Sequence, residues 1–517
     1  EINVITLNCW GLLHISAQRS ARLTAIGRAL AATSFSNGES PHIVALQECW
    51  TQEDYQSIRR ETRFVLPYGK FYHSGAFGGG LAILSRWPIE ESSMHRYPLN
   101  GRPTAFWRGD WFVGKGIGCA RVRYGNRPRD VVEVFNTHTH AIYEHAPRTD
   151  SYHVHRLSQA WELSKLLRGA AARGHLVLAL GDFNDVPLSL TYRVLTAHAP
   201  IRDVWRVLHP DSSLGAAEDD LERARRRPIP TAEFNVVENG VTSNSVYNTW
   251  RWPKKQQKQL GRPGRDPIEI PPDSLDKRGK RLDYIFASSG AFEGEEDVKA
   301  GWVVKDARVA MLHRHPELQC SLSDHFSVEA TLVLHRVAPT ASPNHLDRDG
   351  RSASRPDSPS IQQAELNSGA FLDVQSHPSS VDLFESGPKK PHRRGSADEA
   401  LSFSAQLEAF RSPVPCLPAA TYDEILTLIQ KYEVREKFQR RWRGVHFFTW
   451  VVVTIVCWVG VWFTPPYVSF ILMLLSSLGL VAGVIDGLVS LLFIGTELRA
   501  LKEFEWEMMN AKAIASG

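Results

Sequence analysis

The stretch Leu176 to Asn184 reads L-V-L-A-L-G-D-F-N, an apolar run that stops at Gly181-Asp182-Phe183-Asn184. Five consecutive apolar residues followed by glycine predict a buried strand, and this strand delivers Asp182 and Asn184 from its C-terminal end. Taken alone, G-D-F-N is more typical of a strand that ends in a turn, where an Asp side chain bonds to nearby backbone. The rest of the chain decides between a turn and a functional site.

Polar side chains follow comparable apolar runs at several other places. These side chains are Asn8, Glu48, His138, Asp283, Asp324 and His325. A single histidine or acid at a strand end most often has a structural role. Because binding and catalytic groups gather where loops leave a rigid scaffold, the recurrence of the pattern predicts that these strand ends meet in one cleft. We therefore expect a single active site.

Residues 1–337 are expected to form one α/β domain. Strands are predicted at Ile2–Leu7, Ile43–Leu46, Leu81–Leu84, Ile117–Val122, Val131–Asn136, Leu176–Leu180, Leu282–Ala287 and Phe326–Leu334. Helices are predicted at Arg19–Ala32, Glu53–Thr62 and His153–Arg168. Some of the strands alternate between apolar and polar residues and others are wholly apolar. This mixture favours a sheet with one covered face, or two sheets packed together.

Composition limits the classes of function. The 517 residues carry 60 Lys and Arg against 56 Asp and Glu, and the formal net charge of +4 is too small to indicate nucleic acid by itself. The six cysteines show no C-x-x-C spacing, so we expect free thiols in a reducing compartment and no zinc site. The chain opens without Met and enters a strand at once. We therefore expect no signal peptide, and a numbering that starts inside a longer natural product.

Two segments differ in composition from the predicted domain. Residues Arg251–Lys280 form a polar insertion with nine basic and four acidic residues. A solvated loop is the simpler interpretation of this insertion. The more specific interpretation is that its basic residues are attracted to an anionic membrane surface. Residues 338–420 are rich in Ser, Pro and charged residues and poor in aromatic residues, which predicts a disordered linker.

The C-terminal part is predicted to enter a membrane. An amphipathic helix over residues 421–443 ends in the basic cluster Lys437–Arg443. Two apolar segments follow, at residues 445–463 and 467–494. Each is long enough to cross the hydrocarbon layer, which needs about 20 residues. The turn between them, T-P-P, is short, so the two segments are expected to form a hairpin.

Both ends of such a hairpin lie on one side of the membrane. The basic cluster before it, and Arg499 and Lys502 in the tail 495–517 after it, place that side in the cytosol together with the catalytic domain. The endoplasmic reticulum and the mitochondrial outer membrane both fit this prediction. Asp486 is an acid within the second apolar segment, where a contact between helices or between subunits of a homodimer would explain it.

The polar groups predicted to share the cleft are carboxylates, amides and histidines. Such oxygen donors favour Mg²⁺, or Mn²⁺ in its place, over zinc. Glu48 is the best candidate for a metal ligand, with Asn8 beside it. His325 can take a proton from an attacking water while Asp283 holds its imidazole. His138 can donate a hydrogen bond to a phosphoryl oxygen or to the leaving group, and Asp182 and Asn184 can position the water and the phosphate.

These motifs resemble those of the endonuclease/exonuclease/phosphatase superfamily. They are L-N-C-W-G at 7–11, A-L-Q-E at 45–48, N-T-H-T-H-A at 136–141, G-D-F-N at 181–184, R-L-D-Y-I-F at 281–286 and S-D-H-F at 323–326. Longer stretches resemble the neutral sphingomyelinase family, and in particular the fungal inositol phosphosphingolipid phospholipases C. They are F-Y-H-S-G at 71–75, G-L-A-I-L-S at 80–85, N-G-R-P at 100–103, R-G-D-W-F-V-G-K at 108–115 and N-T-W at 248–250.

The resemblance implies a four-layer sandwich, in which two β-sheets are flanked by helices as in pancreatic DNase, with a C-terminal membrane hairpin. It implies that Glu48 is the metal carboxylate and His325 the general base, with His138, Asp182, Asn184, Asp283 and Asp324 in supporting roles. It also implies that Asp110 and Lys115 form a switch in which the lysine enters the site on activation. A surface salt pair is the plainer interpretation of these two residues, and G-K-G at 114–116 lacks the rest of a nucleotide-binding P-loop.

The implied reaction is phospholipase C-type hydrolysis of an inositol phosphosphingolipid or of sphingomyelin, with anionic phospholipids as activators at Arg251–Lys280 and Lys437–Arg443. Three alternatives stay open: a nuclease, an inositol polyphosphate phosphatase, and an inactive membrane tether. The absence of a strongly basic face with interleaved aromatic residues argues against a nuclease and against a nucleic-acid partner. The phosphatases are expected to carry W-C-D-R around the late aspartate, where this chain has R-L-D-Y at 281–284.

Overall fold

The computed structural model describes residues 1–143, 150, 152–264, 267–290, 292–293, 299–337, 396–411 and 417–517. Its strands are β1 Ile2–Asn8, β2 Ile43–Gln47, β3 Tyr68–Tyr72, β4 Leu81–Ser85, β5 Ile89–Arg96, β6 Gly116–Arg123, β7 Val131–His138, β8 Leu176–Asp182, β9 Arg202–Asp203, β10 Asp283–Ala287, β11 Phe292–Glu293, β12 Lys299–Ala310 and β13 Ser327–Val337. Its helices are α1 Arg19–Ala32, α2 Gln52–Thr62, α3 His153–Ala172, α4 Leu190–His198, α5 Val204–Leu208, α6 Asp220–Ala224, α7 Ala232–Val237, α8 Lys254–Gln257, α9 Ser396–Arg411, α10 Ala419–Val461, α11 Pro466–Leu488 and α12 Ile494–Ala515. Single helical turns lie at Phe106–Arg108, Thr249–Arg251 and Val489–Phe493.

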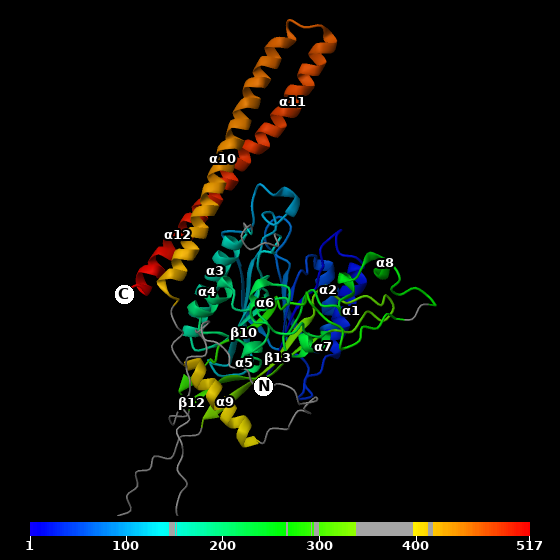
Figure 1. The fold of residues 1–517 in the computed structure, drawn as a ribbon, viewed down its shortest axis with the longest axis vertical. Coiled ribbons are helices and arrows are strands. Elements are labelled where there is room, and N and C mark those ends of the chain that lie inside the picture. The colour runs from blue at the N-terminus through cyan, green and yellow to red at the C-terminus, as the bar shows by residue number, and fades with distance from the viewer. Residues whose placement is uncertain are drawn as a thin grey trace, which may run out of the picture.

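The strands form two sheets that pack face to face (Figure 1). The order in one sheet is β11-β12-β13-β1-β2-β4-β3, and the order in the other is β5-β6-β7-β8-β10-β9. Helices α1 and α2 cover the outer face of the first sheet, and α3 and α4 cover that of the second. The expected four-layer sandwich is therefore confirmed. Strands β1 and β2 run parallel in one sheet, as β7 and β8 do in the other.

The wholly apolar strands are buried on both of their faces. Along β1, Ile2 and Val4 belong to the core between the two sheets, whereas Ile5 and Leu7 pack against the apolar face of α1. Strand β8 is arranged in the same way between the other sheet and α3. Side chains alternate across a strand, so a strand with a covering layer on each side needs apolar residues at every position.

Several strands and ends differ from the sequence prediction. The edge strand β5 reads I-E-E-S-S-M-H-R and is largely exposed, so it carries no apolar pattern to recognise. Strand β12 contains a β-bulge between Val304 and Asp306, which breaks its alternation. The predicted strand at 326–334 starts one residue later and runs to Val337. The insertion Arg251–Lys280 was expected to be a solvated loop, but Asp276 within it is buried and Lys280 pairs with Ser243.

The prediction of a disordered linker over 338–420 is wrong for part of that range. Residues Ser396–Arg411 form α9, which packs along the edge of the first sheet against β12 and β13. The side chain of Gln406 accepts a hydrogen bond from the backbone N–H of Val304 at 3.0 Å and donates one to the Val304 carbonyl at 3.1 Å. These bonds supply tertiary order that composition does not reveal. The rest of the predicted linker, up to residue 416, lies outside the described residues.

The two apolar segments form a helical hairpin that projects from the sandwich (Figure 1). Helix α10 runs without a break through the predicted juxtamembrane helix and the first apolar segment, and α11 returns beside it. Both stretches are long and apolar enough to cross a membrane, and only 11% and 17% of their most apolar windows is buried. Such exposure is inconsistent with a core helix of a soluble domain. Gly479 and Gly483 of α11 lie against the ring of Trp450, which allows close packing of the two helices.

The base of the hairpin is packed onto the sandwich. Ile425 and Ile429 of α10 and Leu501 and Phe504 of α12 belong to the same buried cluster as α3 and α4. The segment 495–517, predicted as a tail, is therefore an integral helix of the fold. Asp486 forms ion pairs with Arg443 and His446 of α10, so it joins the two helices of the hairpin within one chain.

Candidate active site

Strand register brings the predicted site residues to one end of the sandwich. Asn8 at the end of β1 pairs with Gln47 at the end of β2, and Glu48 follows directly. In the other sheet, His138 at the end of β7 pairs with Asp182 at the end of β8. Parallel strands end at the same edge of their sheet, so each sheet contributes a neighbouring pair of polar groups. Asn8 Nδ2 bridges the two sheets, donating to Glu48 Oε1 at 3.2 Å and to Asp182 Oδ2 at 3.0 Å.

The backbone at these strand ends needs unusual geometry. A Cβ at Gly181 would lie 1.9 Å from the carbonyl oxygen of Thr137, so only glycine allows β7 and β8 to approach here. Glu48 and Asn184 have positive φ angles of 53° and 45°, a conformation that costs free energy outside glycine. The N–H of Gly11 donates a hydrogen bond to the Glu48 carbonyl at 2.9 Å, and this bond stabilises the bend at Glu48. With these bends, Glu48 Oε1 accepts from Asn8 Nδ2, and Asn184 Nδ2 reaches the carbonyl of Thr139.

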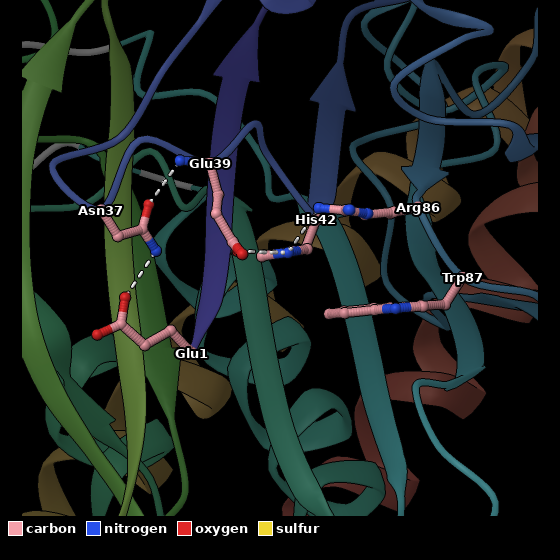
Figure 2. A pocket seen from close by; sticks show the side chains of 6 residues that line it. All are labelled: Glu1, Asn37, Glu39, His42, Arg86 and Trp87. Carbon is pink, nitrogen blue, oxygen red and sulfur yellow. Dashed lines mark hydrogen bonds and ion pairs between the residues drawn. The ribbon is translucent and has the colours of Figure 1, made fainter.

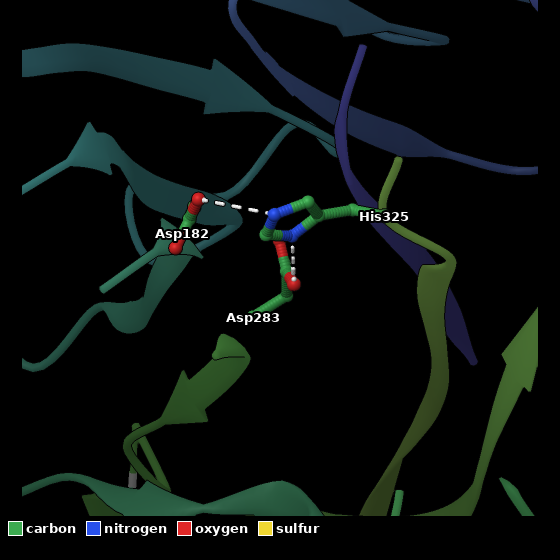
Figure 3. Close-up of side chains that lie close together, drawn as sticks. All are labelled: Asp182, Asp283 and His325. Carbon is green, nitrogen blue, oxygen red and sulfur yellow. Dashed lines mark hydrogen bonds and ion pairs between the residues drawn. The ribbon is translucent and has the colours of Figure 1, made fainter. Parts of the chain in front are cut away.

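His325 lies between two carboxylates (Figure 3). Its Nδ1 is 2.7 Å from Asp283 Oδ2, and its Nε2 is 3.9 Å from Asp182 Oδ2. Burial lowers the pKa of His325, but the charges of Asp283 and Asp182 outweigh burial and hold that pKa well above its ordinary value. The contact with Asp283 fixes the ring orientation and leaves Nε2 facing Asp182. This arrangement suits an imidazole that takes a proton from water.

Glu48 is the natural oxygen donor for a cation. Its Oε2 is buried and has no hydrogen-bond partner among the described residues. Burial and repulsion by Asp324 raise the pKa of Glu48 to about 7, and burial raises the pKa of Asp182 to about 6. Four carboxylates gather here against one lysine, Lys115, and the imidazole of His325. Such an excess of buried negative charge suits a divalent cation; the four are Glu48, Asp182, Asp283 and Asp324.

A second grouping of possible metal donors consists of Asp182, Asp283 and His325, whose nearest ligand atoms lie within 4.8 Å of one another. A metal held there would have to displace the 2.7 Å contact between His325 and Asp283. We favour Glu48, because its Oε2 has no hydrogen-bond partner among the described residues and oxygen is the ligand that Mg²⁺ prefers. Asn8 turns its amide nitrogen toward the carboxylates, so metal ligation by Asn8 requires rotation of its side-chain amide.

The remaining predicted site residues line the same cleft. His138 Nε2 is 3.6 Å from Asp182 Oδ2, and burial lowers the pKa of His138 well below its ordinary value. Asn184 Nδ2 and Lys115 Nζ both donate to the backbone carbonyl of Thr139, at 3.3 Å and 2.9 Å. Burial lowers the pKa of Lys115. A neutral histidine, an amide and a lysine therefore present donor groups beside the carboxylates.

Asp110 and Lys115 do not form the surface salt pair that was the plainer interpretation. Both side chains are buried, and no ion pair joins them in the described part of the chain. The carboxylate of Asp110 instead accepts a hydrogen bond from Tyr143 Oη at 2.7 Å and lies 3.6 Å from His140 Nε2. Lys115 is directed to Thr139, inside the site. The switch itself stays a prediction.

Sequence patterns did not identify the residue that holds the active-site loops together. Arg22 of α1 is fully buried, and its guanidinium donates to the carbonyls of Cys9, Trp10 and Leu322 at 2.7–3.2 Å. It lies over the ring of Trp10, 4.6 Å from the centroid. Arg22 thereby joins the loop after Asn8 to the loop before His325. The sequence feature that could have identified Arg22 is the position of an arginine on the apolar face of a predicted helix.

One cavity lies away from these groups. It has a volume of about 560 Å³ and is lined by Glu1, Asn37, Glu39, His42, Arg86 and Trp87 (Figure 2). His42 precedes β2 and Arg86 follows β4, so this cavity lies at the opposite end of the first sheet from Glu48. Its polar groups largely satisfy one another, as in the 3.2 Å contact between His42 and Glu39. The site lies at the strand ends and not in this cavity.

Comparison with known proteins decides the family. Residues 5–325 match the model described as the endonuclease/exonuclease/phosphatase family. Inositol phosphosphingolipids phospholipase C of Schizosaccharomyces pombe is 40% identical over 334 residues, which cover 65% of this chain and 69% of that protein. The chain belongs to the neutral sphingomyelinase family of this superfamily. The fungal resemblance noted in the sequence is thus confirmed.

Further relatives agree with this family. Inositol phosphosphingolipids phospholipase C of Saccharomyces cerevisiae is 30% identical over 532 residues, which cover 99% of this chain and 90% of that protein. Sphingomyelin phosphodiesterase 2 of Homo sapiens is 32% identical over 205 residues, which cover 40% of this chain and 46% of that protein. The neutral sphingomyelinase relatives are phosphodiester hydrolases by name, and the chain is an enzyme of that class.

Proposed function

We propose that this enzyme is a Mg²⁺-dependent phospholipase C-type phosphodiesterase. It hydrolyses inositol phosphosphingolipids, sphingomyelin or both, to ceramide and a phosphorylated headgroup. The observation that carries the proposal is the pairing of His325 with Asp283 directly opposite Asp182 and Glu48. The substrate class comes from the names of the relatives, which name inositol phosphosphingolipids and sphingomyelin as the compounds cleaved.

His325 takes the proton of a water molecule that attacks phosphorus in line with the bond to ceramide. That P–O bond breaks, the phosphoryl group stays with the headgroup, and the ceramide oxygen receives a proton. Asp283 accepts from His325 Nδ1 and stabilises the imidazolium that forms, which follows from their 2.7 Å contact. His138, Asn184 and Lys115 stabilise the charge that develops on the phosphoryl oxygens.

Glu48, with Asn8 after its amide rotates, is the pair that would hold the metal. The buried, unpartnered Oε2 of Glu48 and the surplus of carboxylates around it fit a hard divalent cation. When bound, Mg²⁺ or Mn²⁺ would neutralise that surplus and withdraw charge from the phosphoryl group. The chain's own contribution is to orient the histidines and exclude other donors.

We further propose that the hairpin anchors the enzyme with its catalytic domain facing the cytosol, in the endoplasmic reticulum or the mitochondrial outer membrane. The exposed side chains of Lys437, Arg440 and Arg441, and the largely exposed basic side chains that the structure describes within Arg251–Lys280, would attract anionic phospholipids. Anchoring keeps the enzyme at high effective concentration near a substrate that never leaves the bilayer.

The experiment is hydrolysis of inositol phosphorylceramide and of sphingomyelin in mixed micelles, with Mg²⁺ or with chelator, for the wild type and Glu48→Ala. We expect ceramide release that requires the metal and is lost in the variant. Loss of Glu48 removes a buried repulsion with Asp324, so the variant is expected to fold. The assay is run with and without acidic phospholipid, and activity that is indifferent to acidic lipid would exclude the proposed activation.

The same assay distinguishes the other functions. Cleavage of DNA or of an inositol phosphate, without ceramide release from either lipid, would keep the fold and discard the substrate. A folded chain that cleaves none of these compounds would be the inactive tether. The contacts of Asn8 with Glu48 and of His325 with Asp283 support an active site over a tether.

A further inference from the structure

Large apolar side chains are exposed on the loops that surround the active site. We call them the apolar rim; its members are Leu13, Ile15, Phe77, Trp107, Ile142 and Leu188. Trp107 is 82% exposed and Phe77 is 63% exposed. Single exposed apolar residues are common on protein surfaces, whereas a set that surrounds a functional opening marks an interaction surface.

Strand register places all of these loops at the same end of the sandwich. Leu13 and Ile15 follow β1, Ile142 follows β7, and Leu188 follows β8, the strands that end in site residues. Phe77 precedes β4, whose start pairs with the end of β2. Trp107 precedes β6, whose start pairs with the end of β7. The apolar rim therefore lies at the end of the sandwich that carries the site residues.

A chain of aromatic contacts connects this rim to the hairpin. The rings of Phe77 and Phe112 lie 6.1 Å apart, and those of Phe112 and Trp111 lie 5.2 Å apart. Trp111 in turn contacts Phe493, with 4.3 Å between ring centroids. Phe493 is at the end of the second apolar segment, just before α12 turns back onto the catalytic domain. This contact holds the apolar rim beside the residues at which the second apolar segment of the hairpin ends.

We propose that the apolar rim docks into the interface of the bilayer, with Trp107 and Phe77 inserted among the lipid headgroups and upper acyl chains. The proposal rests on the proposed function insofar as the hairpin spans that bilayer. Figure 1 shows the hairpin rising from the domain on the side where the loops between β3 and β6 protrude. Tryptophan is enriched at membrane–water interfaces, because its ring is apolar and its N–H is polar. The cleft then opens directly onto the lipid surface.

Phe64 is a matched control. It is 83% exposed, but it precedes β3, whose start pairs with the end of β4 at the opposite end of the sheet. The test uses the full chain in phosphatidylcholine vesicles, with an environment-sensitive fluorophore on Trp107→Cys or on Phe64→Cys. The wild type treated with the same reagent corrects for native thiols. Quenching is measured with a nitroxide on the lipid chain and with aqueous iodide.

We expect lipid nitroxide to quench the label at 107 and iodide to quench the label at 64. Equal quenching of both labels by iodide would overturn the proposal. So would a label at 107 that neither quencher reaches, because this result means that protein, such as a second copy of the chain, covers the rim. The measurement needs no substrate, so it stands even if the proposed reaction is wrong.

A second arm measures hydrolysis by the double variant Trp107→Ala/Phe77→Ala. We expect kcat/KM to fall about tenfold on sphingolipid in vesicles. A fall of this size corresponds to the loss of roughly one buried aromatic contact with the lipid. Activity in detergent micelles, where substrate reaches the cleft without docking, should be unchanged, as should that of Phe64→Ala in both systems. An equal loss in micelles and vesicles would overturn a docking role.

Discussion

At the scale of single residues, the chemistry depends on how each polar group is held by its neighbours. His325 obtains its orientation from one carboxylate, Asp283, whose other oxygen is buried without a hydrogen-bond partner in the described chain. Replacing that carboxylate by an amide preserves the shape of the site but removes the charge that stabilises the imidazolium. The histidine and the aspartate should therefore behave as one functional unit.

We predict that Asp283→Asn lowers kcat by about 10²–10⁴-fold, the usual contribution of positioned acid–base groups. Steady-state hydrolysis of the sphingolipid, alongside thermal unfolding, measures this effect. Glu238→Gln is a matched control, since Glu238 lies 3.1 Å from His209 in a pair outside the site. A loss in Asp283→Asn that is no larger than in Glu238→Gln would show that His325 works without its partner.

The sequence allowed part of this site to be predicted. Asn8, Glu48, His138 and Asp182 follow buried strands, whose apolar runs are visible without any tertiary information. Arg22 was missed, because a helical pattern shows which face is buried but not which carbonyls meet there. The turn of Lys115 toward Thr139 likewise depends on contacts between residues far apart in the chain.

At the scale of elements, the contact between the hairpin base and the catalytic domain contains buried titratable groups. Glu497 of α12 lies 3.2 Å from His155 Nε2 of α3 and accepts a hydrogen bond from Tyr432 of α10. Burial raises the pKa of Glu497 to about 8, despite Tyr432, Arg102 and Arg435. Burial and the charge of Glu497 raise the pKa of the neighbouring Glu436 to about 7, despite Arg435, His155 and Arg102. These carboxyls are expected to hold protons in the docked state.

Such a contact should weaken as the pH rises. A carboxyl with a raised pKa binds its proton more tightly in the folded state, so its contribution is complete below about pH 4.5 and is lost as the pH passes through about 8. We predict that the free energy of unfolding falls between these values by up to about 1.4 kcal/mol per pH unit for each such proton. Glu497→Gln should flatten this dependence.

Thermal unfolding of the full chain in detergent from pH 5 to pH 9 measures this dependence. Glu503→Gln is the control, because Glu503 is an exposed glutamate of the same helix and should leave the slope as in the wild type. A slope that is the same in Glu497→Gln as in the wild type would contradict the account of this contact.

Helices and strands were predictable where apolar residues recur in their own sequence at the spacing of a helix or a strand. The bounds of α1 agree with the prediction, since its apolar positions recur at helical spacing. Helix α9 and strand β5 were missed, because one is ordered by contacts with β12 and the other is an exposed edge. The juxtamembrane helix and the first apolar segment were predicted separately, although no residue between them interrupts α10.

At the scale of the whole molecule, the account joins a phosphodiesterase cleft to a membrane hairpin. The strand ends that carry the site, the apolar rim and the base of the hairpin lie together, so under the proposed docking a lipid phosphodiester would reach His325 without leaving the bilayer surface. The central claim is that water activated at this cleft attacks phosphorus and releases ceramide with an intact hydroxyl.

Hydrolysis in ¹⁸O-labelled water tests this claim most directly. The full-length enzyme acts on inositol phosphorylceramide or sphingomyelin with Mg²⁺, and both products are analysed by mass spectrometry, with His325→Ala as the reference without catalysis. We predict one ¹⁸O atom in the phosphorylated headgroup and none in ceramide. Label in the ceramide hydroxyl, or release of a phosphorylated lipid in place of ceramide, would contradict the account.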